Sequence, residues 1–143
     1  MERRQVIAAG LWAWTLRPAL ATPAAMAAAV SAFTGGKVPT EGRVTLNIAP
    51  LVDNGNAVPV GIQVQSPMTA VDHVQRVALF TPANPQPDVA VFHLGPRNGR
   101  AQVATRMRLA TSQTVIAVAA MSDGSYWQGS AEVLVTLAAC IES

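Results

Sequence analysis

Short runs in which apolar and polar residues alternate recur along the chain from residue 43 onward. In the run 58–64, for example, Val58, Val60 and Ile62 fall on one face of an extended strand. Turn-forming pairs such as Asn98-Gly99 and Asp123-Gly124 separate these runs, and both pairs are typical of type I′ hairpins. The seven expected strands are Arg43–Ile48, Val58–Val64, Val74–Phe80, Val89–Leu94, Ala101–Leu109, Thr114–Ala120 and Glu132–Leu137.

Seven short strands within about 100 residues predict an all-β, immunoglobulin-like antiparallel sandwich. The chain has one cysteine, so this sandwich lacks the disulfide of antibody domains and has to be held by packing. One short helix precedes the strands. Thr22 is the expected N-cap, Pro23 the first helical residue, and the Ala-rich run 24–33 the helix body. Gly35-Gly36 is expected to end it.

The first 21 residues have the pattern of an export signal. Arg3-Arg4 precedes an apolar run of 11 residues, 6–16, and Ala19-Leu20-Ala21 offers a cleavage site. The run is too short for a membrane span, which needs about 20 residues. The arginine pair favours the twin-arginine route to the periplasm over the Sec route, and a short amphipathic helix is the alternative to an export signal. We therefore expect a twin-arginine-type signal peptide at 1–21 and one β-sandwich domain at 22–143, with no membrane partner.

The overall charge gives no support for a nucleic-acid partner. The formal net charge is +2, but three of the ten basic residues and one of the eight acidic ones lie in the first 17 positions. The remaining basic and acidic residues balance, and no arginine and lysine cluster carries interleaved aromatic residues. A single cysteine also excludes a multi-cysteine metal site.

No catalytic motif stands out in the sequence. His73 and His93 are the two histidines, and they are interpreted as polar-face residues unless the fold brings them together beside an acid. Four arginines follow in a short segment, and they fit either a solvated strand face or a site for an anion or a partner. These four residues are Arg97, Arg100, Arg106 and Arg108.

Three further residues call for interpretation. Tyr126 and Trp127 follow the Asp-Gly turn, where core packing is the prediction and an interface anchor the alternative. Cys140 is the sole thiol, three residues from the end of the sequence. A lone cysteine in an exported protein indicates an intermolecular bond or a reactive free thiol. The alternative is a small buried apolar residue that continues Leu137-Ala138-Ala139.

Several segments, in their order and spacing, resemble the SoxY family of bacterial thiosulfate oxidation. The resemblance covers nearly all of the expected mature chain. The segments that carry it are Ala32–Lys37, Asn54–Val60, Ser66–Thr69, Asn84–Pro87, Phe92–Arg97, Ala119–Trp127 and Val135–Cys140. The family fold is an immunoglobulin-like sandwich, which agrees with the strand pattern above.

This resemblance implies a periplasmic sulfur carrier rather than an enzyme. By the match, Cys140 is the residue to which thiosulfate-derived sulfur is covalently attached, and no separate cofactor is implied. The implied partners are a SoxZ-like subunit in a heterodimer, a haem c-type SoxAX-like enzyme that loads the cysteine, a SoxB-like hydrolase and a sulfane dehydrogenase-like enzyme. The alternative is an interaction module of the same fold whose Cys140 forms an intermolecular disulfide or stays unloaded.

The segment around Cys140 departs from the family pattern Gly-Gly-Cys-Gly-Gly. Here the cysteine stands in Ala138-Ala139-Cys140-Ile141-Glu142. Alanine and isoleucine allow the backbone fewer conformations than glycine does. Glu142 adds a negative charge beside a sulfur that would bear an anionic group, which costs about 1 kcal/mol at 4 Å in water. We therefore expect loading to be possible and access to a narrow partner pocket to be reduced.

Overall fold

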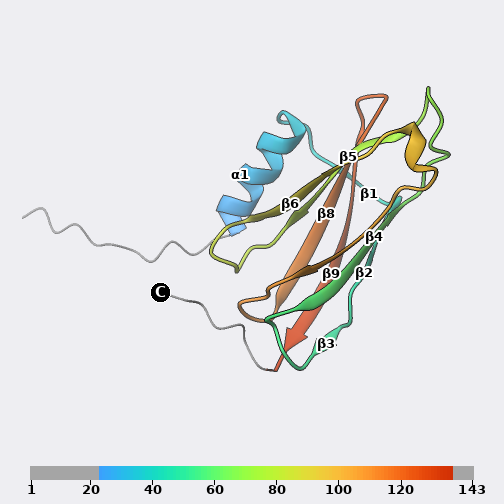
Figure 1. Ribbon diagram of the computed structural model, residues 1–143. Coiled ribbons are helices and arrows are strands. Elements are labelled where there is room, and N and C mark those ends of the chain that lie inside the picture. Colours follow the sequence, from blue (N-terminus) through green and yellow to red (C-terminus); the bar gives the residue numbers. More distant parts are fainter. Residues whose placement is uncertain (1–22, 137–143) are drawn as a thin grey trace, which may run out of the picture.

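The computed structural model describes residues 23–136, which form one helix and nine strands in two sheets (Figure 1). The larger sheet has the order β1-β9-β8-β5-β6, with β3 also beside β9, and the smaller has the order β2-β4-β7. This arrangement confirms the all-β sandwich with a short N-terminal helix. The elements are α1 (Pro23–Thr34), β1 (Thr40–Glu41), β2 (Val44–Asn47), β3 (Leu51–Val52), β4 (Val58–Val64), β5 (Val74–Phe80), β6 (Asp88–His93), the 3-10 helix η1 (Pro96–Asn98), β7 (Gln102–Met107), β8 (Gln113–Met121) and β9 (Tyr126–Val135).

The core lies between the sheets and follows from the alternation in sequence. In β4, Val58, Val60 and Ile62 are all at most 2% exposed, whereas the residues between them face away from the core. They pack in one cluster with buried residues of β5 and β8, such as Val77 and Val115. Each such side chain contributes about 1.5–3 kcal/mol on full burial, so the core holds the fold without a disulfide.

Helix α1 ends where the glycine pair predicts. Gly35 and Gly36 have φ of +66° and +91°, a region that favours glycine, and the Gly36 N–H donates to the carbonyl of Ser31 at 2.9 Å. The buried Thr34 hydroxyl donates to the carbonyl of Lys37 at 2.6 Å, which turns the chain back toward the sheet. The expected N-cap, Thr22, lies outside the described residues.

The prediction of a type I′ turn was wrong at both Asp123-Gly124 and Asn98-Gly99, for different reasons. Asp123-Gly124 does lie in the β8–β9 hairpin, but its loop has three residues and a positive φ only at Gly124. Three-residue hairpin loops of this kind need only one residue with positive φ, and here that residue is the glycine. Asn98-Gly99 joins strands of different sheets, because β6 pairs with β5 and β7 pairs with β4. Asn98 instead ends η1, and its side-chain oxygen accepts from the N–H of Gly95 at 2.8 Å.

The last strand differs most from its prediction. β9 begins at Tyr126 and not at Glu132, and it pairs antiparallel with β8 from Tyr126 to Val133. Within it, a Cβ on Gly129 would overlap the carbonyl oxygen of Val44 in β2, so the two sheets come into close contact there. The two-residue strands β1 and β3, absent from the sequence prediction, pair in parallel with opposite ends of β9. Over residues 23–136, no helix is long and apolar enough to cross a membrane.

Candidate functional site

Cys140 lies outside the described residues, but the segment that leads to it is described up to Thr136. The Thr136 N–H donates to the carbonyl of Val52 at 3.0 Å, and its hydroxyl donates to the carbonyl of Asp53 at 3.2 Å. One residue earlier, the N–H of Val135 donates to the hydroxyl oxygen of Ser112 at 2.8 Å. The chain is therefore fixed to the sandwich up to four residues before the cysteine, beside β3 at one end of the larger sheet (Figure 1).

The loop between β3 and β4 forms part of the support at this end. Gly55 is buried in the loop, and its carbonyl accepts from the N–H of Leu109 at 2.8 Å, just beyond β7. The side chain of Asn54 accepts from the N–H of Asn56 at 2.9 Å, a hydrogen bond typical of a local turn. This loop is one of the segments that carry the family resemblance, and it joins the ends of β4 and β7 to the region where β9 ends.

The same end carries an exposed apolar surface that was not predicted from the sequence. Leu51 of β3 and Leu134 of β9 are register partners, and they are 58% and 63% exposed. The N–H of Leu134 donates to the carbonyl of Pro50 at 2.8 Å, which places a third apolar residue beside them. Ser130, Glu132 and Leu134 are alternate residues of β9 and all face outward. An apolar residue that follows two polar ones at such positions is the sequence feature that could have indicated this surface.

The two histidines do not converge. His93 is the register partner of Arg76, and His73 lies three residues before Arg76, just ahead of β5. About 10 Å of extended chain therefore separates the two histidine positions along the strand direction. The Nδ1 atom of His73 lies 3.0 Å from the carbonyl of Thr69, and His93 is exposed. The polar-face interpretation is therefore confirmed. Within residues 23–136, no group of three or more histidine, cysteine, aspartate or glutamate residues is placed to hold a metal ion.

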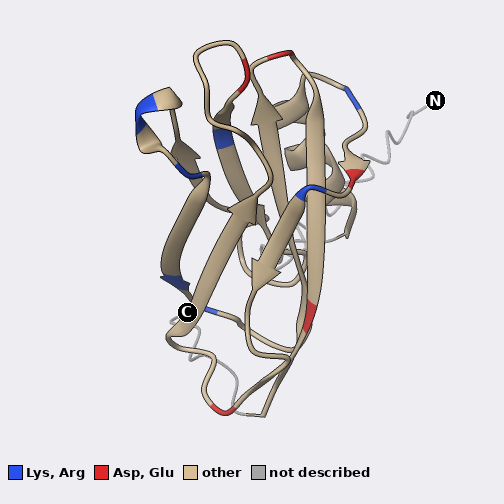
Figure 2. Ribbon diagram, turned by 90° about the vertical axis from the view of Figure 1, so that its right-hand side faces the viewer, with Lys and Arg blue, Asp and Glu red and all other residues tan. Residues whose placement is uncertain are grey.

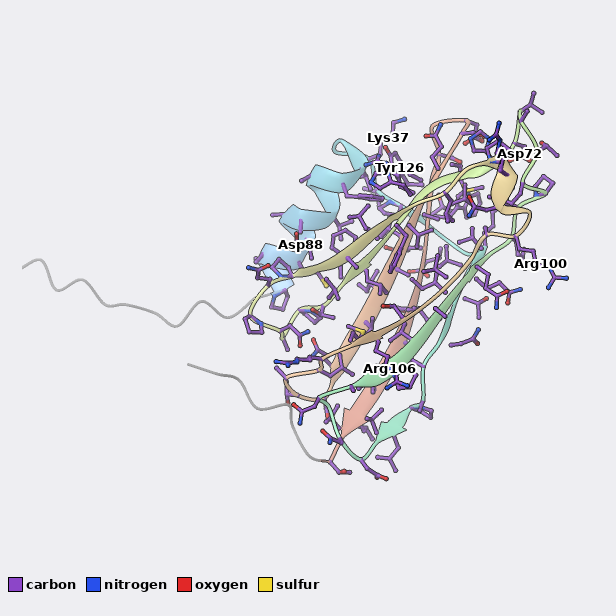
Figure 3. The ribbon with its side chains drawn as sticks, viewed as in Figure 1. Lys37, Asp72, Asp88, Arg100, Arg106 and Tyr126 are labelled. Atoms are coloured by element: carbon purple, nitrogen blue, oxygen red, sulfur yellow. The ribbon has the colours of Figure 1, made fainter. Side chains whose placement is uncertain are left out.

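Three basic side chains pack on aromatic rings of the fold. Lys37 lies 5.8 Å from the ring centre of Tyr126, and the two are neighbours at the end of α1 (Figure 3). Arg43 lies 4.4 Å from the ring of Trp127. A third such contact joins Arg76 and Phe33 at 4.6 Å. Each contact contributes about 0.5–1 kcal/mol at an exposed site, so these cations have a structural role.

The four arginines in and next to η1 and β7 make no such contacts within residues 23–136. All four are exposed, and none forms an ion pair or a ring contact with another described residue. In Figure 2 the Lys and Arg segments, in blue, are spread over several strands and loops, and Arg100 points away from the protein in Figure 3. Their exposure confirms that these arginines face solvent. A role in binding an anion or a partner stays a prediction. These residues are Arg97, Arg100, Arg106 and Arg108.

Tyr126 and Trp127 are part of the packing, as predicted. Trp127 packs against the main core, and Tyr126 against the smaller cluster under α1. The indole N–H of Trp127 donates to the Ser125 hydroxyl at 3.2 Å, and that hydroxyl hydrogen-bonds the carboxylate of Asp123. The hydrogen bonds from Ser125, with a smaller contribution from the charge of Arg43, lower the pKa of Asp123 below 3.8. This hairpin lies at the opposite end of β9 from Thr136.

Comparison with known proteins identifies the family. The family model of the sulfur oxidation protein SoxY matches residues 30–140. The chain belongs to the SoxY family. The structure of the sulfur carrier protein SoxY from Chlorobium limicola f thiosulfatophilum is similar, with 28% identity and a TM-score of 0.66 over 80% of this chain and 98% of that one. No curated protein matches the chain in sequence.

More distant structures share the fold alone with this SoxY-family chain. The superoxide reductase (neelaredoxin) from Ignicoccus hospitalis has 17% identity and a TM-score of 0.58, covering 66% of this chain and 80% of that one. The superoxide reductase from Nanoarchaeum equitans has 15% identity and a TM-score of 0.57, covering 68% of this chain and 100% of that one. At these identities the likeness is one of architecture and says nothing about chemistry.

Proposed function

We propose that this protein is a periplasmic sulfur carrier, and that Cys140 holds the sulfur covalently. The observation that carries the proposal is the family match, which runs to residue 140 and so includes the one cysteine of the chain. The described fold supports it with a segment fixed at Thr136 and a cysteine four residues beyond. A carrier needs a stable domain and a thiol that partner enzymes can reach. The described fold supplies the domain, and the proposal assigns the thiol to Cys140.

The first step is an oxidative bond formation at Cys140. The thiolate sulfur joins the outer sulfur of thiosulfate to give Cys140–S–S–SO₃⁻. Two electrons leave, and the haem iron of a SoxAX-like partner accepts them one at a time. The thiolate is the reactive form, so the thiol gives up its proton before the bond forms. Disulfide-type bonds form and exchange readily at such a sulfur, which suits a carrier.

The later steps release sulfate and regenerate the thiol. Water cleaves the S–SO₃ bond in a SoxB-like hydrolase, which leaves Cys140–S–S⁻ and gives sulfate and two protons. A sulfane dehydrogenase-like enzyme then oxidises the outer sulfur to Cys140–S–SO₃⁻ with three waters, releasing six electrons and six protons. A second hydrolysis gives sulfate and the free thiolate. The carrier itself contributes the sulfur anchor and no catalytic group to these steps.

The partners and compartment follow from the same proposal. A SoxZ-like subunit forms the stable heterodimer, and the three enzymes contact it in turn. The signal pattern of residues 1–21, which lie outside the described residues, supports export by the twin-arginine route. That route carries folded proteins and would allow the two subunits to assemble before export.

The test is a loading reaction with purified components. The heterodimer is incubated with thiosulfate and the haem c-type enzyme, and reduced haem is counted by absorbance while the carrier is weighed by intact mass spectrometry. The proposal predicts two reduced haem equivalents for each S–SO₃ group added, and no addition to Cys140→Ser. Thiosulfate oxidation that leaves the wild-type mass unchanged, or a product that is only a Cys140-linked dimer, would favour an interaction module instead.

A further inference from the structure

An apolar patch lies on the outer face of the larger sheet at the end where β9 ends. We define the apolar patch as Pro50, Leu51 and Leu134, all exposed. The two leucines come from adjacent strands in register, so their side chains form one surface rather than two scattered residues. The other end of this face is different, because α1 covers it with Val30 and Phe33.

The apolar patch contributes little to folding, since more than half of each leucine is in contact with water. Its backbone, by contrast, is firmly held by the β3–β9 pairing and the bond from Leu134 to Pro50. The patch is therefore a rigid apolar surface that the described fold leaves uncovered. Adjacent apolar residues exposed together are a feature of surfaces that contact another molecule.

The position of Cys140 in the sequence determines what approaches this patch. Thr136 is hydrogen-bonded to Val52 and Asp53, and it follows Leu134 by two residues. Cys140 lies four positions after Thr136, and a fully extended chain over those four steps spans at most about 14 Å. An enzyme that reacts with the sulfur of Cys140 has to bring its reactive group within that distance of Thr136. Its surface then lies against this end of the sandwich.

The small size of the patch favours a transient partner over a permanent one. Obligate heterodimers bury about 2,000 Å² or more, whereas brief redox encounters bury less than about 1,200 Å². Three side chains supply only the centre of a small interface. A second copy of this chain or a SoxZ-like subunit would require a larger apolar surface.

We propose that the apolar patch is the surface on which the enzymes that act on Cys140 dock, and that these enzymes present an apolar rim around the entrance to their reactive centre. This inference rests on the proposed carrier function and adds a specific contact to it. Docking at the patch places the start of the tail beside the entrance, which raises the effective concentration of Cys140 there.

The test compares two matched double variants. Leu51→Thr/Leu134→Thr removes the apolar patch and keeps residues suited to strands. Val38→Thr/Val71→Thr is the control, because these valines are 89% and 88% exposed near the β8–β9 loop, at the opposite end of β9. For each variant in the heterodimer, the haem c-type enzyme is assayed for KM and kcat of loading. The reaction of Cys140 with a small disulfide reagent, the thermal midpoint and retention of the partner subunit are measured in parallel.

The inference predicts that the patch variant raises KM about tenfold, equivalent to about 1.4 kcal/mol. The same variant keeps kcat, the rate with the small reagent, the thermal midpoint and the partner subunit, and the control variant keeps every parameter. An unchanged KM, an equal rise in the control, or loss of the partner subunit from the patch variant would overturn the inference while leaving the carrier function intact. If the single variant Leu134→Thr already unfolds the protein, the patch is structural and the inference also fails. Absence of any loading in the wild type would reject the carrier function itself.

Discussion

The outer face of the larger sheet has two halves that differ in the exposure of their apolar residues. In one half, α1 lies over β5 and β8 and encloses Phe80 and Val118, which are at most 2% exposed (Figure 1). The ring of Phe33 packs edge-on against Phe80 at 5.9 Å between centres. In the other half, Leu51 and Leu134 are more than half exposed, and no described element covers them.

This difference in exposure separates a half that stabilises the fold from a half that is available for contact with partners. Burial under α1 removes apolar area from water, so the covered half stabilises the fold. The bare half gains no such stability, and its leucines lie next to the segment that leads to Cys140. Substitutions should therefore separate stability from partner recognition, with β9 as the strand common to both halves.

The largest expected effect is that of Gly129→Ala, which affects both halves through β9. The added Cβ would overlap the backbone carbonyl of Val44, and β2 cannot shift to relieve the overlap without a loss of stability. We expect a loss of about 3 kcal/mol or more in the free energy of unfolding, measured by urea denaturation. Ser130→Ala, on the exposed side of the same strand, is the control and should change stability by less than about 0.5 kcal/mol.

A smaller loss is expected for Phe33→Ala in the covered half. The ring contacts Phe80 and Tyr126 and lies under the guanidinium of Arg76, so its removal loosens α1 from the sheet. Since Phe33 is only partly buried, the loss should be about 2 kcal/mol, below the 3–5 kcal/mol for a fully buried phenylalanine. Sulfur loading at Cys140 should be unchanged at temperatures where the variant is folded. A loading defect without a stability loss would contradict the division between the halves.

Leu134→Thr should have almost no effect on stability. With 63% of the side chain exposed, little apolar burial is lost, and we expect a change below about 0.5 kcal/mol in the same urea assay. Threonine also keeps the strand propensity of the site. A loss as large as that of Phe33→Ala would remove the distinction between the halves and assign both to folding.

The smallest expected effect concerns pH and the hairpin at the far end of β9. Hydrogen bonds from Ser125 lower the pKa of Asp123 below 3.8, so its stabilising contribution is present above pH 3.8 and is lost as the pH falls through the lowered pKa. Asp123→Asn should therefore have a slightly lower thermal midpoint than the wild type at pH 7. The two midpoints should converge as the pH falls below 3.8, and a difference that persists at lower pH would refute this origin.

The local pattern predicted most of the fold because most of its elements depend on local sequence. Alternation located the six strands β2 and β4 to β8 and the second half of β9, and the glycine pair located the end of α1 at Thr34. The two-residue strands β1 and β3 escaped prediction, since they exist only through pairing with β9, far away in sequence. The start of β9 was missed because Gly129 interrupts the apolar alternation there, at a position set by contact with Val44. Asn98-Gly99 looked like a hairpin because the pair does not reveal which sheet each neighbouring strand joins.

The candidate site was predictable only in part. The lone cysteine and the family resemblance singled out Cys140, which lies outside the described residues, so its role as the attachment residue stays a prediction. The support at Thr136 was not predictable, because its partners Val52 and Asp53 are more than eighty residues away in sequence. Nor could sequence alone tell that Leu51 and Leu134 are neighbours.

The central claim is that Cys140 carries sulfur, and intact mass spectrometry of the native protein tests it most directly. The protein would be purified from the periplasm of cells that oxidise thiosulfate, without reductant, and weighed before and after thiol treatment. The account predicts an added S–SO₃ group or a few sulfur atoms, removed by thiol and absent from Cys140→Ser. An unmodified Cys140 in cells that actively oxidise thiosulfate would contradict it.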